Sequence, residues 1–443
     1  MESTTMPRNV IWITTDHMRY DFIGAHGNTD MHTPNLDALI NQGISFERCY
    51  ANNPLCMPSR CSFMTGLYPP QTQVTFNGQE LASDFTPTVA QCFANGGYRT
   101  VQIGKLHFQC HEDSDLDPKP KDRYGFDVFQ LSEEPGCYDD AYITWLRGER
   151  PDLVETFTLP RPMSPARHTE SRRFHVLDAP WEYSHSGWVA TQATRYLYAW
   201  GKRAERQFLH LGLYAPHPPL NPTREMFEPY RDIDIKITRS EEDWADANQM
   251  DEATLKEYKR HFYAMISGVD FAIGKLIEAL KANGEFEDTL IIFGSDHGDA
   301  CGDHGRTSKG SSYYEGIMRL PLVFYWPKGL GTPGKRESGL VEMVDVLPTI
   351  LGLTGLPIPP VMQGQSYADS MQQGQTIDGR QDVYAYDGNG DIMLRSHDFK
   401  YNRYVRDNRE VLYDLRTDLR RIPQRRKRSS LPASPAHHAG SCL

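Results

Sequence analysis

The sequence predicts an α/β fold in which helices sandwich a large, mixed but mostly parallel sheet, followed by a small antiparallel sheet. Two observations support the large sheet. Residues 9–15 (NVIWITT) and 289–295 (TLIIFGS) are apolar, rich in β-branched residues and too short for helices, as is typical of strands buried on both faces. Strand-like and helix-like segments then alternate along the chain, which indicates a layered α/β architecture.

The other elements of the large sheet follow from the same patterns. Further strands are predicted at 100–104, 208–214 and 320–326. The helices predicted between the strands lie at 33–42, 86–95, 188–203, 258–283 and 344–352.

Beyond residues 357–360 (PIPP), short strand-like pieces alternate with Asp, Gly and Asn turns, which predicts a small antiparallel subdomain. The pieces lie at 383–386, 392–396, 400–403 and 411–415. We therefore expect a large α/β domain at 1–365, the subdomain at 366–418 and a tail at 419–443. The tail is basic (RRIPQRRKR), lacks apolar periodicity and is predicted to be disordered.

Composition argues against several classes of protein. A formal charge of -11 disfavours nucleic acid as a partner, so an anionic ligand would need a local positive pocket. No run approaches the roughly 18 apolar residues of a membrane span, and residues 1–8 contain no apolar signal-peptide core. Eight cysteines without Cys-x-x-Cys spacing are typical of free thiols in a reducing compartment. We therefore expect a cytoplasmic location.

One short motif constrains the chemistry more than any other part of the chain. Cys56 lies in PLCMPSR, two residues before a proline and four before Arg60, and the motif is followed by Met-Thr-Gly at 64–66. An isolated cysteine of this kind is more often a packed thiol than a functional group.

The chain resembles the sulfatases of the alkaline phosphatase superfamily, from about residue 9 to residue 418. The motifs that carry this resemblance, in order, are NVIWITTD, TPNLD, CMPSR, GKLH, APHPP, SDHG, Lys309 with Tyr314-Glu315, and LYDL. The resemblance implies an alkaline-phosphatase-like fold and oxidation of Cys56 to formylglycine by a maturation enzyme. The nucleophile would then be an aldehyde hydrate.

A metal site is expected at the carboxyl ends of the predicted strands 9–15 and 289–295. Asp16 and Asp296 directly follow these strands, and such ends meet at one edge of a parallel sheet. Carboxylates are hard donors for a divalent cation. Each Asp alone would be more often a helix cap or a loop residue. The resemblance implies that Asp16, Asp296, His297 and the hydrate at Cys56 hold one ion.

The identity of the ion stays open at this point. His297 stands where many relatives have an amide, and His17 where many have a second acid, so this site contains more imidazole than usual. Calcium is favoured by the resemblance and manganese by the imidazole ligands. His17 is a further candidate ligand. The neighbouring Asp299, Asp303 and His304 are expected to be loop or supporting residues.

The resemblance also implies a set of polar contacts to the anion: Arg60, Lys105, His107, His217 and Lys309. Arg60 has a planar fork that could anchor the hydrate, and the two lysines could hold sulfate oxygens. His217 or Lys309 would protonate the leaving oxygen, and His107 would take the remaining proton of the hydrate. Lys105 and His107 alternate after a predicted strand, so both can point to one site.

Two weaker signals concern the rest of the site. Asn77, in the sequence TFNG, could contact the hydrate or the substrate, but a turn role for Asn-Gly is at least as favourable. The aromatic residues Trp181, Tyr183 and Trp188 end a segment that begins at Tyr138. They could line a substrate pocket, although the sequence does not show which way they face.

The sequence therefore predicts a metal-dependent sulfuric ester hydrolase of the arylsulfatase type. One alternative is a phosphonate or phosphate ester hydrolase of the same superfamily, which the GKLH motif disfavours. Another is a catalytically silent binding protein in which Cys56 is never converted. The expected partners are a small sulfate ester and the maturation enzyme, with a second copy of the chain as an option, and neither nucleic acid nor membrane.

Overall fold

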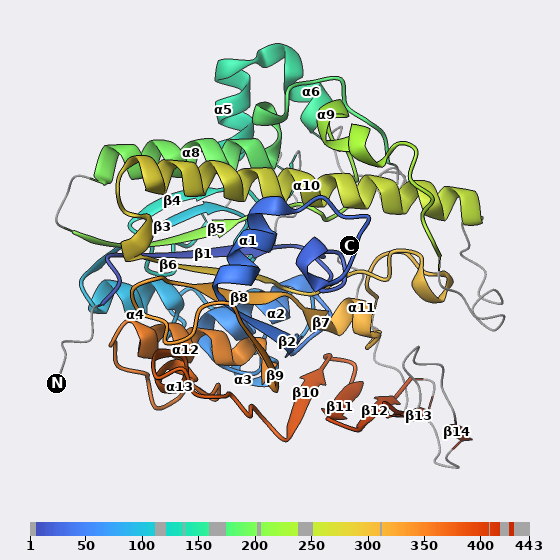
Figure 1. Ribbon diagram of the computed structural model, residues 1–443. Helices are drawn as coiled ribbons and strands as arrows, with labels where there is room; N and C mark the ends of the chain where they lie inside the picture. The colour runs from blue at the N-terminus through green and yellow to red at the C-terminus, as the bar shows by residue number, and fades with distance from the viewer. Residues whose placement is uncertain are drawn as a thin grey trace.

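The computed structural model describes residues 6–110, 121–135, 138–158, 174–201, 205–237, 251–310, 312–406, 408–416 and 425–428. Within these residues a nine-stranded sheet runs in the order β4-β3-β5-β1-β6-β8-β2-β7, and β9 pairs with β2 (Figure 1). Its strands are β1 (Asn9–Thr15), β2 (Ile44–Tyr50), β3 (Tyr98–Gly104), β4 (Val128–Leu131), β5 (Arg206–Gly212), β6 (Thr289–Ser295), β7 (Arg319–Leu320), β8 (Leu322–Tyr325) and β9 (Lys335–Glu342).

The centre of this sheet is parallel and its far side is mixed. Strands β4, β3, β5, β1 and β6 are parallel neighbours. Beyond β6, β8 is antiparallel to both β6 and β2, and β9 is parallel to β2. Thr14 of β1 is level with Gly212 and with Gly294, so the carboxyl ends of β5, β1 and β6 finish together.

The alternation of side chains along each strand separates two apolar cores. Val10 and Trp12 of β1 pack into the core on one face. Ile11 and Ile13 pack into the core on the other. Because successive side chains of a strand point to opposite faces, an uninterrupted apolar run is needed where helices cover both.

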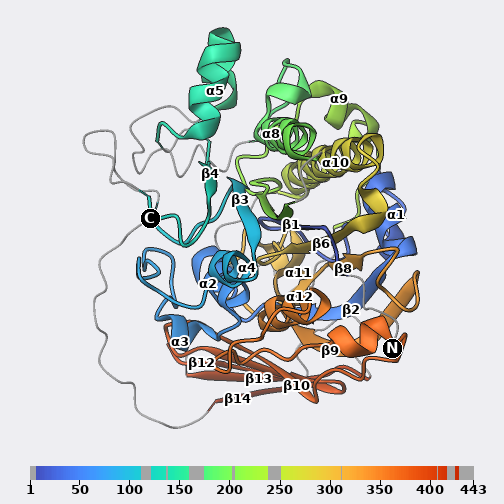
Figure 2. The same ribbon diagram turned by 90° about the vertical axis from the view of Figure 1, so that its left-hand side faces the viewer.

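Helices cover both faces of the sheet (Figures 1 and 2). On one side lie α1 (Pro34–Gln42), α8 (His185–Trp200) and α10 (Glu252–Ala282), and on the other α2 (Cys56–Thr65), α4 (Val89–Asn95) and α12 (Val346–Leu353). The shorter helices are α3 (Pro69–Thr72), α5 (Ala141–Glu149), α6 (Val154–Phe157), α9 (Arg224–Phe227), α11 (Glu315–Met318) and α13 (Ala368–Gln372). None of the described helices combines the length and the apolar content that a membrane span requires.

A second sheet lies at the C-terminal side of the molecule, at the bottom of Figure 2. Its antiparallel strands, in order, are β10 (Asp382–Tyr386), β11 (Ile392–Ser396), β12 (Phe399–Tyr404), β13 (Arg409–Asp414) and β14 (Arg425–Arg428). Strand β14 lies inside the tail predicted to be disordered and pairs with β13, because an edge strand offers free backbone groups to any extended segment. The rest of the tail lies outside the described residues, and the domain boundaries stay a prediction.

The predicted fold class is confirmed, with specific differences in the elements. Residues 9–15 and 289–295 are strands with the predicted ends. The strand expected at 320–326 is two strands, because Pro321 has no N–H to donate. Helix α4 begins later than expected because Thr88 forms its capping box, and α8 begins earlier because the Ser184 side chain caps it. Strands β2, β4 and β9 and helix α2 were not predicted.

Candidate active site

The candidate site lies where β1, β3 and β6 end. Thr15 is level with Ser295, so the next residues, Asp16 and Asp296, lie side by side, and the Asp296 N–H donates to the Thr15 carbonyl at 3.2 Å. Lys105 follows β3 in the same way, and its N–H donates to Gly212 at 2.8 Å. The convergence predicted from the strand ends is therefore confirmed.

Cys56 is the first residue of α2, so it reaches the site from the layer of helices that also contains α4 and α12. Its side chain is 1 % exposed. Two asparagines hold this end of the helix: Asn53 Oδ1 accepts the N–H of Leu55 at 2.8 Å, and Asn77 Oδ1 accepts that of Met57 at 3.1 Å. Unpaired N–H groups at a helix start favour oxygen acceptors and negative charge nearby. Asn77 thus supports Cys56 through the backbone of the helix.

Asp16, Cys56, Asp296 and His297 form a buried cluster in which one ligand atom from each lies within 4.8 Å of the others. Nε2 of His297 is 3.2 Å from Cys56 Sγ and 3.5 Å from Asp16 Oδ1. A second grouping of this kind joins Asp16 and Cys56 with His17 and His217. The first group is the predicted set of ligands. In the second, His17 was a further candidate ligand, whereas His217 was expected to be a proton donor.

The two imidazoles beside Cys56 present bare nitrogens to the cluster. Nδ1 of His297 lies 2.8 Å from the Gly298 carbonyl, which can only accept, so Nδ1 carries the proton. Nδ1 of His17 lies 2.7 Å from Asp299 Oδ2, which fixes the same tautomer. Burial lowers the pKa of both rings and keeps them neutral. Each Nε2 lone pair therefore faces the cluster, as in a metal ligand.

Asp16 has unusually few hydrogen-bond donors for a buried carboxylate. Its Oδ1 accepts from the Cys56 thiol at 3.7 Å, whereas its Oδ2 lies 2.8 Å from Lys105 Nζ as an ion pair and, within the described residues, accepts no regular hydrogen bond. Burial alone would raise the pKa of Asp16, yet the positive charges of Lys105, His217 and Lys309 hold it well below its ordinary value. The carboxylate is therefore ionised, and its Oδ2 is held by ion pairs rather than by a regular hydrogen bond.

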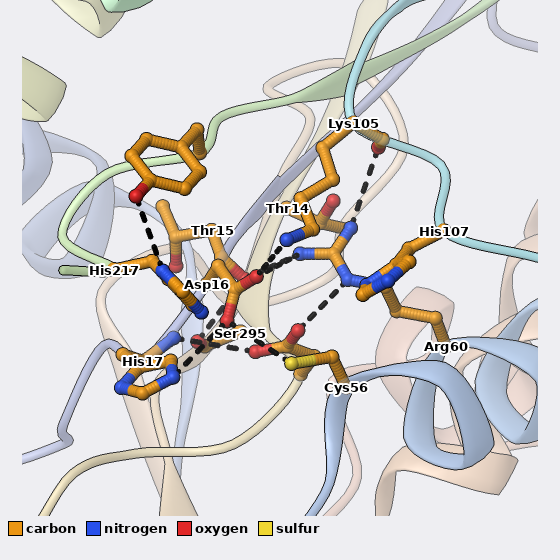
Figure 3. Close-up of polar contacts among 12 residues, drawn as sticks. Thr14, Thr15, Asp16, His17, Cys56, Arg60, Lys105, His107, His217 and Ser295 are labelled. Carbon is orange, nitrogen blue, oxygen red and sulfur yellow. Dashed lines mark hydrogen bonds and ion pairs between the residues drawn. The ribbon is translucent and has the colours of Figure 1, made fainter. Parts of the chain in front are cut away.

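Three cations contact the cluster: Lys309, and the two that Figure 3 shows, Arg60 and Lys105. Arg60 Nε donates to Asp296 Oδ2 at 2.8 Å, and its Nη atoms donate to the carbonyls of Thr15 and Lys105. Lys309 Nζ donates to Cys56 Sγ and lies 3.0 Å from Nε2 of His17 and of His297. Burial would lower the pKa of Lys105 and of Lys309, but neighbouring anions raise both, so both ammonium groups stay charged.

Two further histidines lie at the edge of the cluster. The rings of His217 and His17 are 4.4 Å apart, and His217, whose side chain is 17 % exposed, is the more accessible. His107 is drawn on the side of the cluster opposite His217 (Figure 3). Its backbone is left-handed, with φ of 59°, and its N–H donates to Glu133 Oε1 at 3.0 Å. A non-glycine residue in this conformation is strained and persists where its surroundings hold it, as in many active sites.

The sequence did not predict the acidic pair at 133–134. Glu134 Oε1 lies 3.2 Å from Lys105 Nζ and 3.6 Å from His217 Nε2, so it joins the cation to the histidine. Burial raises the pKa of Glu133 to about 7. Both acids follow β4, whose carboxyl end lies at the same edge as that of β3. That position was the available signal, but β4 was not recognised as a strand.

The remaining candidates are supporting or unrelated residues. Asp299 orients His17, as expected of a residue outside the cluster. Asp303 pairs with Arg19 at 2.7 Å. His304 stacks on Tyr314 with ring centroids 3.9 Å apart. Asn77 forms the expected turn with Gly78, whose φ is 95°.

Comparison with known proteins identifies matches over most of the chain. A family model described as Sulfatase matches residues 8–356, and one described as N-sulphoglucosamine sulphohydrolase, C-terminal, matches 302–427. An arylsulfatase of Clostridium perfringens is 27 % identical over 93 % of this chain and 89 % of its own length. Human iduronate 2-sulfatase is 27 % identical over 81 % of this chain and 71 % of its own.

Solved structures agree with this fold. The phosphonate monoester hydrolase of Agrobacterium radiobacter superposes with a TM-score of 0.77, covers 93 % of this chain and 90 % of its own, and is 24 % identical. At this level of identity the likeness concerns the fold, which is the one predicted from the sequence.

Proposed function

This chain belongs to the sulfatase family and is a sulfuric ester hydrolase, and we propose that its nucleophile is a formylglycine made from Cys56. The observation that carries the proposal is the place of the Cys56 side chain. It begins a helix, is almost fully buried, and contacts both a metal-ligand histidine, His297, and a cation, Lys309. A hydrated aldehyde there supplies a hydroxyl nucleophile between these groups.

One divalent cation fits between Asp16, Asp296, His297 and the oxygen of the modified Cys56. Two carboxylates and the unprotonated Nε2 of His297 converge there, and Asp16 Oδ2 accepts no regular hydrogen bond within the described residues. When bound, the cation polarises the ester and favours the ionised hydroxyl. The imidazoles favour manganese, and the family favours calcium. Metal analysis of the purified protein, followed by reconstitution with each ion, distinguishes the two.

The positive groups hold and neutralise the sulfate. Lys309 Nζ contacts Cys56 Sγ, and Lys105 Nζ lies 2.8 Å from Asp16 Oδ2, so both ammonium groups are placed to hold an anion bound at Cys56. Arg60 is fixed by Asp296 and two carbonyls, and it orients the nucleophile without having to move. Charges that are already in place stabilise a transition state without the cost of reorganisation.

Two histidines exchange the protons. His217 is partly exposed and lies beside Glu134, so it can protonate the leaving alcohol oxygen and recover a proton from solvent. His107 lies on the other side of the cluster, where it takes the proton of the second hydroxyl so that sulfate is released. Glu133 holds the backbone of His107 in its strained conformation.

Conversion of Cys56 requires a maturation enzyme as a partner. Because the side chain is buried, that enzyme must act before the chain has folded. The described cysteines outside the motif are free thiols, which supports the cytoplasm as the compartment. A homo-oligomer stays a prediction.

Two experiments test the proposal. Mass analysis of the tryptic peptide that contains Cys56 should give a mass lower than that of the thiol, and an unmodified peptide in active enzyme would contradict the mechanism. Steady-state rates on phenyl sulfate and on the matching phenyl phosphonate decide the ester class. We expect the sulfate to be preferred, and a clear preference for the phosphonate would overturn this order.

A further inference from the structure

An apolar cavity lies beside the candidate site, under α8, α9 and α10, which run together along one face of the molecule (Figure 1). Its volume is about 70 Å³, several times the roughly 10–15 Å³ that one water molecule needs. The walls include Trp181, Tyr214, Ala215, Met226 and Ala264. Of the aromatic residues that the sequence suggested as lining a substrate pocket, Trp181 thus lines this cavity, whereas Trp188 is packed in the core against Tyr142.

The walls of the cavity are uncharged. Among the described residues that line it there is no Asp, Glu, Lys or Arg. Its one ionisable imidazole, His185, is kept neutral, because burial lowers the pKa of this ring to about 3. The polar groups on the walls are neutral, among them the side chains of Ser184, Asn221 and Thr223. A charge brought into such a space would lose its hydration without gaining a partner of opposite charge, which costs several kcal/mol. Apolar groups meet no such penalty.

The cavity and the proposed sulfate site share a wall. Tyr214 lines the cavity, its ring centroid lies 5.6 Å from Lys105 Nζ, and its hydroxyl lies 3.2 Å from His217 Nδ1. On the other side, Pro135 lines the cavity and follows Glu134, which contacts both Lys105 and His217. Lys105 and His217 are not among the described residues that line the cavity, and Tyr214 borders both spaces, so a group attached to a sulfate held by Lys105 would enter the cavity past Tyr214.

We infer that this cavity binds the alcohol part of the substrate, and that this part is an uncharged apolar group of about the size of one ring. The inference rests on the proposed function, because it takes the sulfate to lie at Lys105 and His217. Trp181, Tyr214 and Met226 supply flat and adaptable apolar surface for such a group. Sugar acids and other charged alcohols would place a charge against these walls.

A substrate panel tests the class of alcohol on the unmodified enzyme. The panel contains phenyl sulfate, 4-carboxyphenyl sulfate and methyl sulfate. A para-carboxylate makes the phenolate a slightly better leaving group, so a lower kcat/KM must come from binding. We expect phenyl sulfate to exceed 4-carboxyphenyl sulfate by at least tenfold in kcat/KM. Equal values, or a preference for the charged ester, would overturn the inference.

A matched pair of variants on α10 locates the effect. Ala264→Met puts a longer side chain into the cavity, whereas Ala279→Met makes the same change at an equally buried position of α10 that does not line it. We expect Ala264→Met to lower the ratio of kcat/KM for phenyl sulfate over methyl sulfate at least tenfold, and Ala279→Met to leave the ratio within twofold. The same ratio in both variants would overturn the assignment.

Binding of phenol, measured by calorimetry, separates this inference from the proposed function. Phenol should bind the native enzyme and bind Ala264→Met at least tenfold more weakly, whether or not Cys56 is converted. Absence of phenol binding to the native enzyme contradicts the inference even if sulfate esters are hydrolysed. Phenol binding without any sulfatase turnover supports the cavity and contradicts the proposed nucleophile.

Discussion

Two buried charged clusters in this molecule use similar residues for opposite purposes. The candidate site joins Asp16 and Asp296 to Arg60. The second, which we call the anchor cluster, joins Glu342 and Asp345 to Arg380, with Tyr68 and Tyr384 beside them. It connects the end of β9 in the large sheet to β10 in the small one.

The two clusters differ in how many hydrogen bonds the protein itself provides to their charged groups. In the anchor cluster, the Asp345 carboxylate accepts hydrogen bonds from Arg380 and from the N–H groups of Gln365 and Glu342. The Glu342 carboxylate accepts from the Tyr384 N–H and the Tyr68 hydroxyl. In the candidate site, Asp16 Oδ2 accepts no regular hydrogen bond within the described residues, and the unprotonated Nε2 atoms of His17 and His297 share one donor, Lys309. A satisfied cluster holds a fold together, and an unsatisfied one is available to a ligand.

The largest effect is expected from a substitution that changes the candidate site and leaves the anchor cluster intact. Cys56→Ala should lower kcat for phenyl sulfate by at least about 10³-fold, because the nucleophile is lost. Its free energy of unfolding should change by less than about 1.5 kcal/mol, since a small buried side chain is exchanged for a smaller one. Steady-state kinetics and urea unfolding measure the two. Retained turnover would mean that the nucleophile lies elsewhere.

Removal of one cation should have the next largest effect. Lys105→Met should lower kcat/KM by about 10²- to 10³-fold, because a charge placed for the transition state is lost. Lys400→Met is the control, since Lys400 is also a buried lysine but lies in the small sheet. It should leave kcat/KM unchanged. Equal losses in both variants would show that Lys105 acts only through folding.

The anchor cluster should respond in stability rather than in rate. Arg380→Met leaves Glu342 and Asp345 buried without their cation, and it should lower the free energy of unfolding by about 3 kcal/mol. Arg336→Met, which removes a hydrogen bond at an exposed site, should change it by less than about 0.5 kcal/mol. If Arg380→Met lowered kcat in fully folded protein, the contrast between the two clusters would fail.

The pH dependence of stability sharpens the contrast. Burial raises the pKa of Glu342 from 4.5 to about 7. The folded protein therefore binds this proton more tightly than the unfolded chain does, and the resulting stability is full below pH 4.5 and lost as the pH rises through 7. Glu342→Gln should reduce the loss of stability between pH 5 and pH 8 by about 2 kcal/mol. Urea unfolding at both pH values measures this, and an unchanged difference would exclude Glu342 as its source.

The smallest effect concerns the helix that carries Cys56. Asn77→Ala removes the acceptor for the Met57 N–H and should cost about 1 kcal/mol of stability. Rates should fall by less than tenfold, because the residue acts through the helix backbone. Asn77→Asp, which keeps the acceptor, should restore stability. A loss of rate above a hundredfold with normal stability would instead indicate direct contact with the substrate.

The sequence by itself predicted the fold class, the central strands and most of the candidate site. Uninterrupted apolar runs at 9–15 and 289–295 are typical of strands covered on both faces, and the acids after them were expected at one edge of the sheet. The resemblance of the motif at Cys56, Pro58 and Arg60 to the sulfatases implied the chemistry. These features are local, because hydrophobic periodicity and motif spacing depend only on residues that are close together in the sequence.

Only the tertiary structure decided which distant side chains meet. The register of β1 with β6 places Asp16 beside Asp296, and β4 brings Glu134 to Lys105 and His217. The tautomers of His17 and His297 depend on acceptors that the fold supplies. The apolar cavity arises between helices far apart in sequence. Such pairings depend on strand order and packing, which no local pattern specifies, because a strand's partners are chosen across the whole chain.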